Sequence, residues 1–199
     1  MGSPVLVLMD YQVGICGVDG LLGSRSGLST HAAERDVLGK AGRTLAAARS
    51  RGIPVIHVGV AFDDAYQNRT NRTAGFEGLE TNGWMLKGSS EAEFNPQVRP
   101  IDGEYVVFKG CVNPFIGTNL LEILVRLDVT DLYLAGTATN YVVESTARHA
   151  GDSGYSVTVL EDLCASYNDE MHLFAIERTL PLFATIGTSA DLLEADGGV

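Results

Sequence analysis

The sequence predicts an α/β fold in which helices cover both faces of a mainly parallel β-sheet. Two observations support this prediction. Short apolar segments alternate along the chain with segments whose apolar residues recur at helical spacing. The apolar segments are also nearly continuous, which is typical of parallel strands that are covered on both faces. Together these features predict a three-layer α/β/α sandwich with right-handed crossovers.

Six segments are expected to form the strands, and all are rich in apolar residues. They are PVLVLM (4–9), IPVIHVGV (53–60), EYVVF (104–108), DLYLA (131–135), YSVTVL (155–160) and the shorter FATIG (183–187). His57 lies inside the second segment and is therefore expected in the core.

Four segments between the strands carry the helical pattern. In the first, apolar residues are spaced so that they share one face. The expected helices cover about 34–51, 117–127, 140–151 and 168–180. Asn168 is a plausible N-cap of the last helix, because Asp169 and Glu170 would occupy its first turn.

The connection from 63 to 103 shows little periodicity and is rich in Gly, Asn, Thr and Ser. A connection of this length inside one domain more often has a function than not. We expect a lid, a substrate wall or an oligomer contact, with a solvated excursion as the alternative. It contains Arg69, Arg72, Phe76 and Trp84.

Composition limits the class of protein. A chain of 199 residues with 45% hydrophobic content can bury a full core, and we expect one domain, residues 1–199. The net charge of −11 argues against nucleic acid or an anionic membrane as a partner. No signal peptide or spanning segment is expected at the N-terminus. Three cysteines, an odd number, favour reduced thiols and a cytoplasmic location.

Ligands of open α/β sheets bind beyond the carboxyl ends of the strands. Asp10 ends the first predicted strand, Lys109 follows the third, and the turn 136–142 follows the fourth. An Asp and a Lys that meet at this edge could form a pair in which the lysine keeps the carboxylate ionised and oriented for acid–base chemistry. The alternative is a structural ion pair.

The remaining candidates for chemistry are weaker. Cys16, Cys111 and Cys164 are each more typical of a small buried residue than of a nucleophile, although Cys111 lies two residues past Lys109. No spacing of His, Cys or acidic residues indicates a metal site, and no phosphate-binding glycine motif is present. No metal or cofactor is expected.

Three segments, taken in order, resemble the isochorismatase-like (cysteine hydrolase) superfamily, which includes nicotinamidases, N-carbamoylsarcosine amidases and isochorismatases. They are VLVLMDYQ, EYVVFKGCVNPFIGTNL and LAGTATNYVVESTARHAGDSGYSVTVLED. The resemblance covers nearly the whole chain and implies catalytic roles for Asp10 and Lys109. We expect the strand order 3-2-1-4-5-6, a small-molecule substrate, and a homodimer or higher homo-oligomer, since family members are commonly dimers or larger.

The sequence departs from the family pattern at one position. By the resemblance, the nucleophilic cysteine should stand where this chain has Val142. A cis peptide is expected between Thr137 and Ala138, in a turn that presents the N–H groups of Ala138 and residue 142 to an oxyanion. The thiol that would form an acyl-enzyme is replaced by a side chain with no lone pair.

Three hypotheses follow from this departure. The chain could be an enzyme that hydrolyses its substrate without a covalent intermediate, through Asp10 and Lys109, for example at a vinyl-ether, enol or imine-type bond. It could instead be a catalytically silent binding protein on the same fold. It could also be an amidase inactivated by Cys→Val, or one that uses Cys111. Further candidates for the substrate pocket are Tyr141, Phe115, Trp84, Arg69, Arg72 and Cys111, and the two arginines could pair with a substrate carboxylate.

Overall fold

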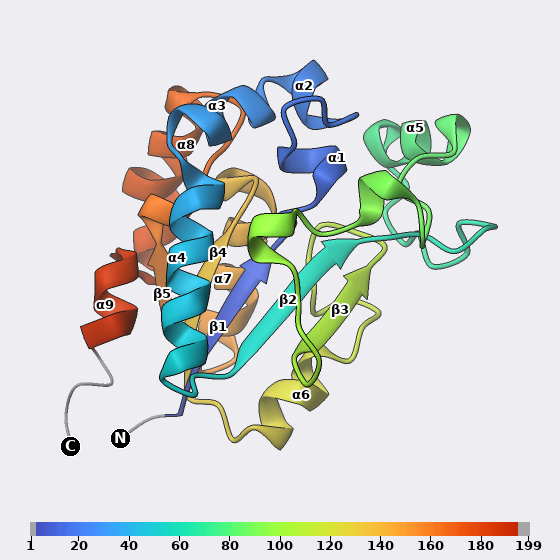
Figure 1. Cartoon of the computed structure of the whole chain (residues 1–199). Coiled ribbons are helices and arrows are strands. Elements are labelled where there is room, and N and C mark those ends of the chain that lie inside the picture. The colour runs from blue at the N-terminus through green and yellow to red at the C-terminus, as the bar shows by residue number, and fades with distance from the viewer. Residues whose placement is uncertain (1–2, 195–199) are drawn as a thin grey trace.

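A six-stranded sheet forms the middle layer of the molecule (Figure 1). The strand order is β3-β2-β1-β4-β5-β6, and each neighbouring pair is parallel. The computed structural model describes residues 3–194. It confirms the predicted fold class and strand order. The predicted domain, 1–199, extends at both ends into residues that lie outside the described range.

The strands lie within two residues of their predicted positions. They are β1 (Pro4–Met9), β2 (Val55–Val60), β3 (Tyr105–Lys109), β4 (Asp131–Gly136), β5 (Ser156–Leu160) and β6 (Thr185–Gly187). His57 is completely buried in β2, as predicted.

Strand β1 is apolar throughout because both of its faces are covered. Leu6 and Leu8 belong to one core cluster, whereas Val5, Val7 and Met9 belong to a second cluster on the other face. Successive side chains of a strand point to opposite faces, so a central strand with two covered faces needs apolar residues at every position.

Helices cover the two faces. Helix α4 packs in the first cluster and crosses the front of the sheet in Figure 1, while α7 lies behind the sheet and packs with α6 in the second cluster. The α-helices are α1 (Val13–Cys16), α2 (Gly23–Ser26), α3 (Leu28–Glu34), α4 (Val37–Ser50), α5 (Ala74–Asn82), α6 (Leu120–Arg126), α7 (Glu144–Asp152), α8 (Asp169–Phe174) and α9 (Ser189–Glu194). The 3-10 turns are Ser90–Ala92, Pro96–Val98, Glu161–Leu163 and Leu180–Leu182, and π-helical turns occupy Thr139–Val143 and Ala175–Thr179.

Two of the predicted helices are interrupted. The segment expected to be one helix over 34–51 is divided, because Asp36 has a left-handed conformation (φ 51°) between α3 and α4. The segment expected over 168–180 begins as α8 and continues as a π-helical turn and a 3-10 turn. Asn168 caps α8 as predicted, since its side chain accepts a hydrogen bond from the N–H of Met171 at 2.9 Å.

The connection 63–103 is more ordered than the sequence indicated, because it contains α5. This helix buries none of its residues, so the sequence lacks the apolar periodicity that reveals a helix packed on a core. Figure 1 shows α5 standing away from the sheet, beyond the carboxyl end of β2. Two bridges tie the connection back to the body, Gln12 with Phe94 and Phe62 with Leu86.

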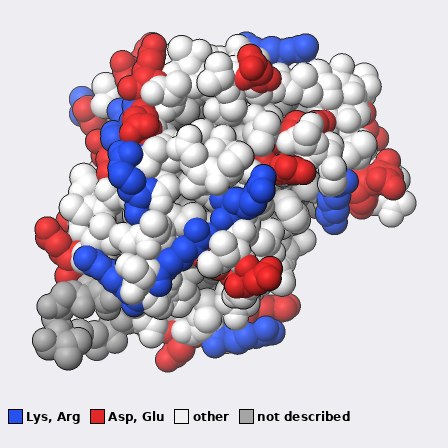
Figure 2. Space-filling view, in the orientation of Figure 1, with Lys and Arg blue, Asp and Glu red and all other residues white. Residues whose placement is uncertain are grey.

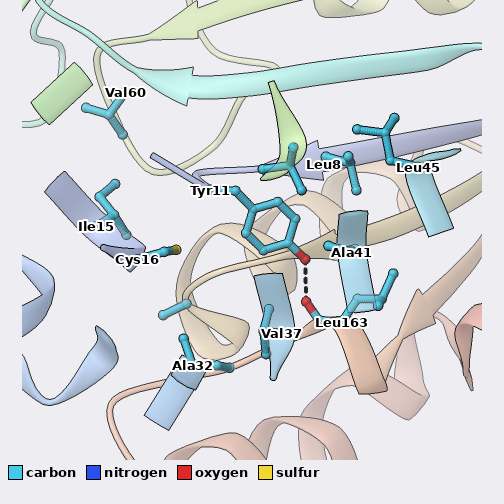
Figure 3. Packing of buried hydrophobic residues seen from close by; sticks show 14 of the residues in the cluster. Leu8, Tyr11, Ile15, Cys16, Ala32, Val37, Ala41, Leu45, Val60 and Leu163 are labelled. Carbon is cyan, nitrogen blue, oxygen red and sulfur yellow. Dashed lines mark hydrogen bonds between the residues drawn. The ribbon is translucent and has the colours of Figure 1, made fainter. Parts of the chain in front are cut away.

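The first core cluster extends to the carboxyl edge of the sheet through Tyr11. Its ring packs among Leu8, Val37 and Ala41 in Figure 3, and its hydroxyl donates to the backbone carbonyl of Leu163. This contact fixes the segment after β1 against the segment after β5. It therefore holds the chain next to Asp10 in place.

Neither sign of charge covers the face shown in Figure 2: basic side chains cross its middle, and acidic ones lie on both sides of them. Within residues 3–194, no helix combines the length and the apolar character needed to cross a membrane.

Candidate active site

Asp10 and Lys109 meet at the carboxyl edge of the sheet. The ammonium Nζ of Lys109 donates to Oδ2 of Asp10 at 2.9 Å and to the backbone carbonyl of Cys111 at 3.1 Å. Both side chains are buried. The expectation that the two groups lie within hydrogen-bond reach at this edge is therefore confirmed.

The second carboxylate oxygen of Asp10 has no partner. Oδ1 is buried and accepts no hydrogen bond from any described residue. Burial raises the pKa of Asp10 above its ordinary value of 3.8, and the charge and hydrogen bond of Lys109 act in the opposite direction. Asp10 also has a left-handed backbone conformation, φ 60°, which is uncommon outside glycine and turns the chain sharply after β1.

The turn after β4 forms the neighbouring wall. The peptide between Thr137 and Ala138 is cis, as expected, and the π-helical turn Thr139–Val143 follows and leads directly into α7. The N–H of Thr139 donates to the carbonyl of Ala165 at 2.8 Å, and the hydroxyl of Thr146 donates to the carbonyl of Val142 at 2.6 Å. These bonds hold both ends of the turn.

A cavity of about 790 Å³ opens between these walls and α5. Its size falls within the range typical of small-molecule sites. Its wall is mostly apolar, with Asp10 and Lys109 among the few charged groups. Residues lining it include Ile15, Leu22, Leu28, Val60, Phe76, Leu79, Val112, Thr137, Ala138, Asn140, Tyr141, Val142 and Tyr167.

A second charge pair and an aromatic pair complete the wall. Arg148 donates to Oε1 of Glu144 through Nε at 3.0 Å and Nη2 at 2.8 Å. The rings of Tyr141 and Tyr167 meet edge to face, with centroids 5.3 Å apart.

The cavity includes some of the residues predicted from sequence and omits others. Asp10, Lys109, Ala138, Val142 and Tyr141 line it. Five predicted pocket residues do not line it within the described part of the chain: Phe115, Trp84, Arg69, Arg72 and Cys111. A contact of these five residues with a substrate stays a prediction.

The omitted residues have other partners or other surroundings. Phe115 stacks on His149, with ring centroids 4.2 Å apart, and Trp84 lies under the guanidinium of Arg25. Arg69 is buried and paired with Glu80, with Nε 2.8 Å from Oε2. Arg72 is exposed on the segment that precedes α5.

Among residues 3–194, no cysteine lines the cavity. The thiol of Cys111 faces the backbone carbonyl of Asn113 at 3.3 Å. Cys16 lies closer to the site, since its sulfur is 2.9 Å from the hydroxyl of Thr137. Burial raises the pKa of the Cys16 thiol to about 12 and that of Cys164 to about 12. Neither of these two thiols has the thiolate character of a nucleophile.

Buried histidines support the turn from behind. Nδ1 of His172 lies 2.8 Å from the hydroxyl of Thr139, and Nδ1 of His31 lies 3.1 Å from the carbonyl of Ser166. Nε2 of His172 is 3.4 Å from Glu161 but makes no hydrogen bond. Burial and the nearby charge of Arg35 lower the pKa of His172 to about 4, so the ring is neutral near pH 7.

Several lining residues were not predicted from sequence. Glu144 and Arg148 are four residues apart, a spacing that predicts a helical ion pair but not a cavity wall. Tyr167 and Leu79 come from segments far from Asp10 in sequence, and only the fold brings them to the cavity. Among the described residues, no three His, Cys, Asp or Glu side chains are grouped so that they could hold a metal ion.

Comparisons with known proteins agree with this architecture. The family model described as Isochorismatase domain matches residues 4–191. The chain is similar to "Uncharacterized isochorismatase family protein YwoC" of Bacillus subtilis (strain 168), with 31% identity over 95% of this chain and 92% of that protein.

Two relatives with named activities are also similar. A ureidoacrylate amidohydrolase, RutB, of Variovorax paradoxus (strain S110) is 27% identical over 79% of this chain and 66% of that protein. The crystal structure of an N-carbamoylsarcosine amidase from Thermoplasma acidophilum has a TM-score of 0.73 and 25% identity, covering 94% of this chain and 96% of that one. The protein belongs to the isochorismatase family of hydrolase-fold proteins.

Proposed function

We propose that this protein is a hydrolase of a small molecule that works without a covalent intermediate, through acid–base chemistry at Asp10 and Lys109. The observation that carries the proposal is the unpartnered Oδ1 of Asp10. It is buried, it belongs to a residue that lines the cavity, and its companion oxygen is held by Lys109. A buried polar atom without a partner costs free energy, which a substrate or water that donates to it would recover.

The roles of the two residues follow from their contacts. Oδ1 of Asp10 takes a proton from a water molecule as the water oxygen attacks the substrate. The same proton then passes to the leaving atom as its bond breaks, so the carboxylate is regenerated. Lys109 fixes the orientation of the carboxylate and opposes the upward shift of its pKa. A carboxyl group whose pKa is raised by burial is better matched to such proton transfer.

Val142 shapes the apolar floor in this mechanism, because its side chain can neither attack nor exchange a proton. In the proposal, the N–H groups of Ala138 and Val142 stabilise negative charge that develops on the substrate, since both residues line the cavity beside Asp10. The order of steps in which Asp10 first takes a proton from water applies to imine-type and carbonyl bonds. At a vinyl-ether or enol-type bond the order is reversed: protonated Asp10 first gives its proton to the alkene carbon, and water then attacks the adjacent carbon and returns a proton to Asp10. Because two similar proteins are named as an amidohydrolase and an amidase, amide-type bonds are also tested.

A second candidate function is binding without turnover. The buried contact between Asp10 and Lys109 would also serve as an ion pair that closes the sheet edge, and such a pair needs no reaction to explain it. An amidase that lost its thiol at position 142 would leave the same structure.

The test is a screen of carbonyl, imine and enol-ether compounds against the wild type and Asp10→Asn. The proposal expects turnover by the wild type and a loss of about 100-fold or more in Asp10→Asn, the usual contribution of a general acid or base. Asp102→Asn is the matched control, because Asp102 is exposed and precedes β3, at the amino ends of the strands. Ligand binding by both proteins without turnover by either would favour the binding function.

A further inference from the structure

The charged groups of the cavity wall are balanced in pairs. Four of the residues that line the cavity within the described chain are charged, namely Asp10, Lys109, Glu144 and Arg148. Lys109 lies 2.9 Å from Asp10, and Arg148 lies 2.8 Å from Glu144. The Asp10–Lys109 pair carries no net charge either as carboxylate with ammonium or as carboxylic acid with neutral amine.

Both cations of the wall are already paired with a carboxylate of the described chain. Lys109 already donates to Asp10 and to the carbonyl of Cys111. The guanidinium of Arg148 lies against the Phe183 ring, 4.3 Å from its centroid, besides donating twice to Glu144. Glu144 is itself held by the hydroxyl of Thr179 at 2.9 Å.

Neither of the two arginines expected from sequence to reach a substrate carboxylate lines the cavity within the described residues, and Arg72 is exposed on the segment before α5. Arg69, expected from sequence to reach a substrate carboxylate, is buried and donates to Glu80 and to the carbonyl of Asn71. A carboxylate entering the cavity would therefore compete with Asp10 and Glu144 for the two cations of the wall. Burial of an unpaired ion is costly, and the cost is largest in an apolar site.

We propose that the cavity binds an uncharged substrate. Its body is apolar or aromatic and contacts Tyr141, Phe76 and Leu79, while an N–H or O–H group donates to Oδ1 of Asp10. This inference rests on the proposed function for the identity of the reacting end, and it adds the class of substrate. It excludes carboxylate-bearing substrates.

The test uses matched pairs of ligands of nearly the same shape, in which an uncharged amide with N–H donors is replaced by a carboxylate without them: benzamide with benzoate, and phenylacetamide with phenylacetate. Dissociation constants are measured for the wild-type protein at pH 7 by ligand-observed NMR and calorimetry. We expect each amide to bind at least 10-fold more tightly than its carboxylate. Equal or tighter binding of either carboxylate, or no binding of any amide, would overturn the proposal.

Two variants assign the preference to the cavity. Glu144→Gln removes one carboxylate and frees Arg148, so the preference for the amide should fall at least fivefold. Arg148→Gln leaves Glu144 unpaired, so the preference should increase. Glu122→Gln, which makes the same charge change at an exposed position of α6, should leave it unchanged. If Glu122→Gln changes the preference for the amide as much as Glu144→Gln does, the net charge of the protein, and not the cavity, decides the preference.

These measurements are independent of turnover. If the amides bind as expected but nothing is hydrolysed, the proposed function fails and the assignment of an uncharged ligand stands. If compounds are hydrolysed but carboxylates bind best, the proposed function stands and the assignment of an uncharged ligand fails.

Discussion

Lys109, the last residue of β3, reaches past the end of β2 to Asp10, which follows β1. Their strands are not neighbours, since β2 lies between them. The 2.9 Å contact therefore needs a long side chain on the edge strand and a short one near the centre of the sheet. The contact between Lys109 and Asp10 forms only when β3, β2 and β1 are in their native register.

Lys109→Met should destabilise the fold by roughly 3–5 kcal/mol, because it leaves the buried carboxylate of Asp10 without its cation. It should also raise the pKa of Asp10 further, since Lys109 now lowers it. A folded-state pKa above the unfolded value makes the native state less stable as pH rises through that interval. The loss in urea unfolding should therefore be larger at pH 8 than at pH 4.

The control for this substitution is Lys87→Met, at an exposed lysine that makes no ion pair within residues 3–194. It should change the free energy of unfolding by no more than about 0.5 kcal/mol. A loss for Lys109→Met that is as small as this, or that does not depend on pH, would contradict the buried ion pair.

Thiol alkylation should leave turnover intact. None of the cysteines lines the cavity within the described residues, and the buried thiols of Cys16 and Cys164 have pKa values of about 12. Treatment with iodoacetamide at pH 7.5, followed by assay on any substrate found in the screen, checks this. Loss of activity in step with modification of Cys111, together with loss of turnover in Cys111→Ser, would show instead that Cys111 acts as the nucleophile.

The buried ring of His172 should make stability depend on pH. Its pKa is lowered from the usual 6.5 to about 4, so below pH 6.5 the unfolded state binds a proton that the folded state does not. The stabilising contribution is thus complete above pH 6.5 and is lost as pH falls toward 4. Arg35, Glu161, Asp169 and His31 are the charged and titratable groups around the ring.

His172→Asn isolates the contribution of this one ring, because the amide can still meet the hydroxyl of Thr139. The variant should be less stable than the wild type at pH 7, and the difference should shrink between pH 6.5 and pH 4 in urea titrations. A difference that stays constant over this interval would show that His172 does not titrate in the way proposed.

The parts of the site that were predicted from sequence share one property: they follow a buried strand directly. Asp10, Lys109 and the turn before Val142 stand at strand ends, and parallel strands bring their carboxyl ends to one edge. Strand order and this edge therefore followed from local patterns and the family resemblance. The cis peptide, and the expectation that Val142 stands at the family's nucleophile position, came from the resemblance alone.

The parts that were missed depend on packing that no local pattern records. Helix α5 buries none of its residues completely, and its apolar residues Phe76 and Leu79 are only half-buried where they pack against the first core cluster and line the cavity. Arg69 was expected to be a free cation, yet its partner Glu80 is 11 residues away on a helix that the sequence did not predict. Charge pairing decides what an arginine can bind, and pairing is a property of the folded chain.

Self-association is expected and stays a prediction. Strand β3 is an edge strand, and Val106 and Phe108 on it are each 40% exposed. Exposed apolar side chains on an edge strand favour pairing with another copy. Multi-angle light scattering at low micromolar concentration should show a species of at least twice 21.2 kDa. A single 21.2 kDa species would contradict it.

The final prediction concerns Val142→Cys. Val142 is almost completely buried, lines the cavity with Asp10, and lies two residues before α7. A thiol at this position would stand near the positive end of the helix and near Lys109, both of which favour the thiolate. The Asp10 carboxylate could accept its proton. Valine and cysteine differ little in volume, so the substitution should cost only about 1 kcal/mol.

We therefore expect Val142→Cys to fold and to gain a thiol that reacts with iodoacetamide faster than free cysteine at pH 7, measured by mass spectrometry. Val143→Cys is the matched control, because Val143 is as buried as Val142 and packs in the same second core cluster, but does not line the cavity within the described residues. Its thiol should react slowly. In Val142→Cys, adding Asp10→Asn should slow the reaction. If the thiol at 142 reacts no faster than free cysteine, this cavity does not activate a nucleophile at that position. Turnover in the Asp10→Asn comparison would then decide between acid–base hydrolysis and binding alone.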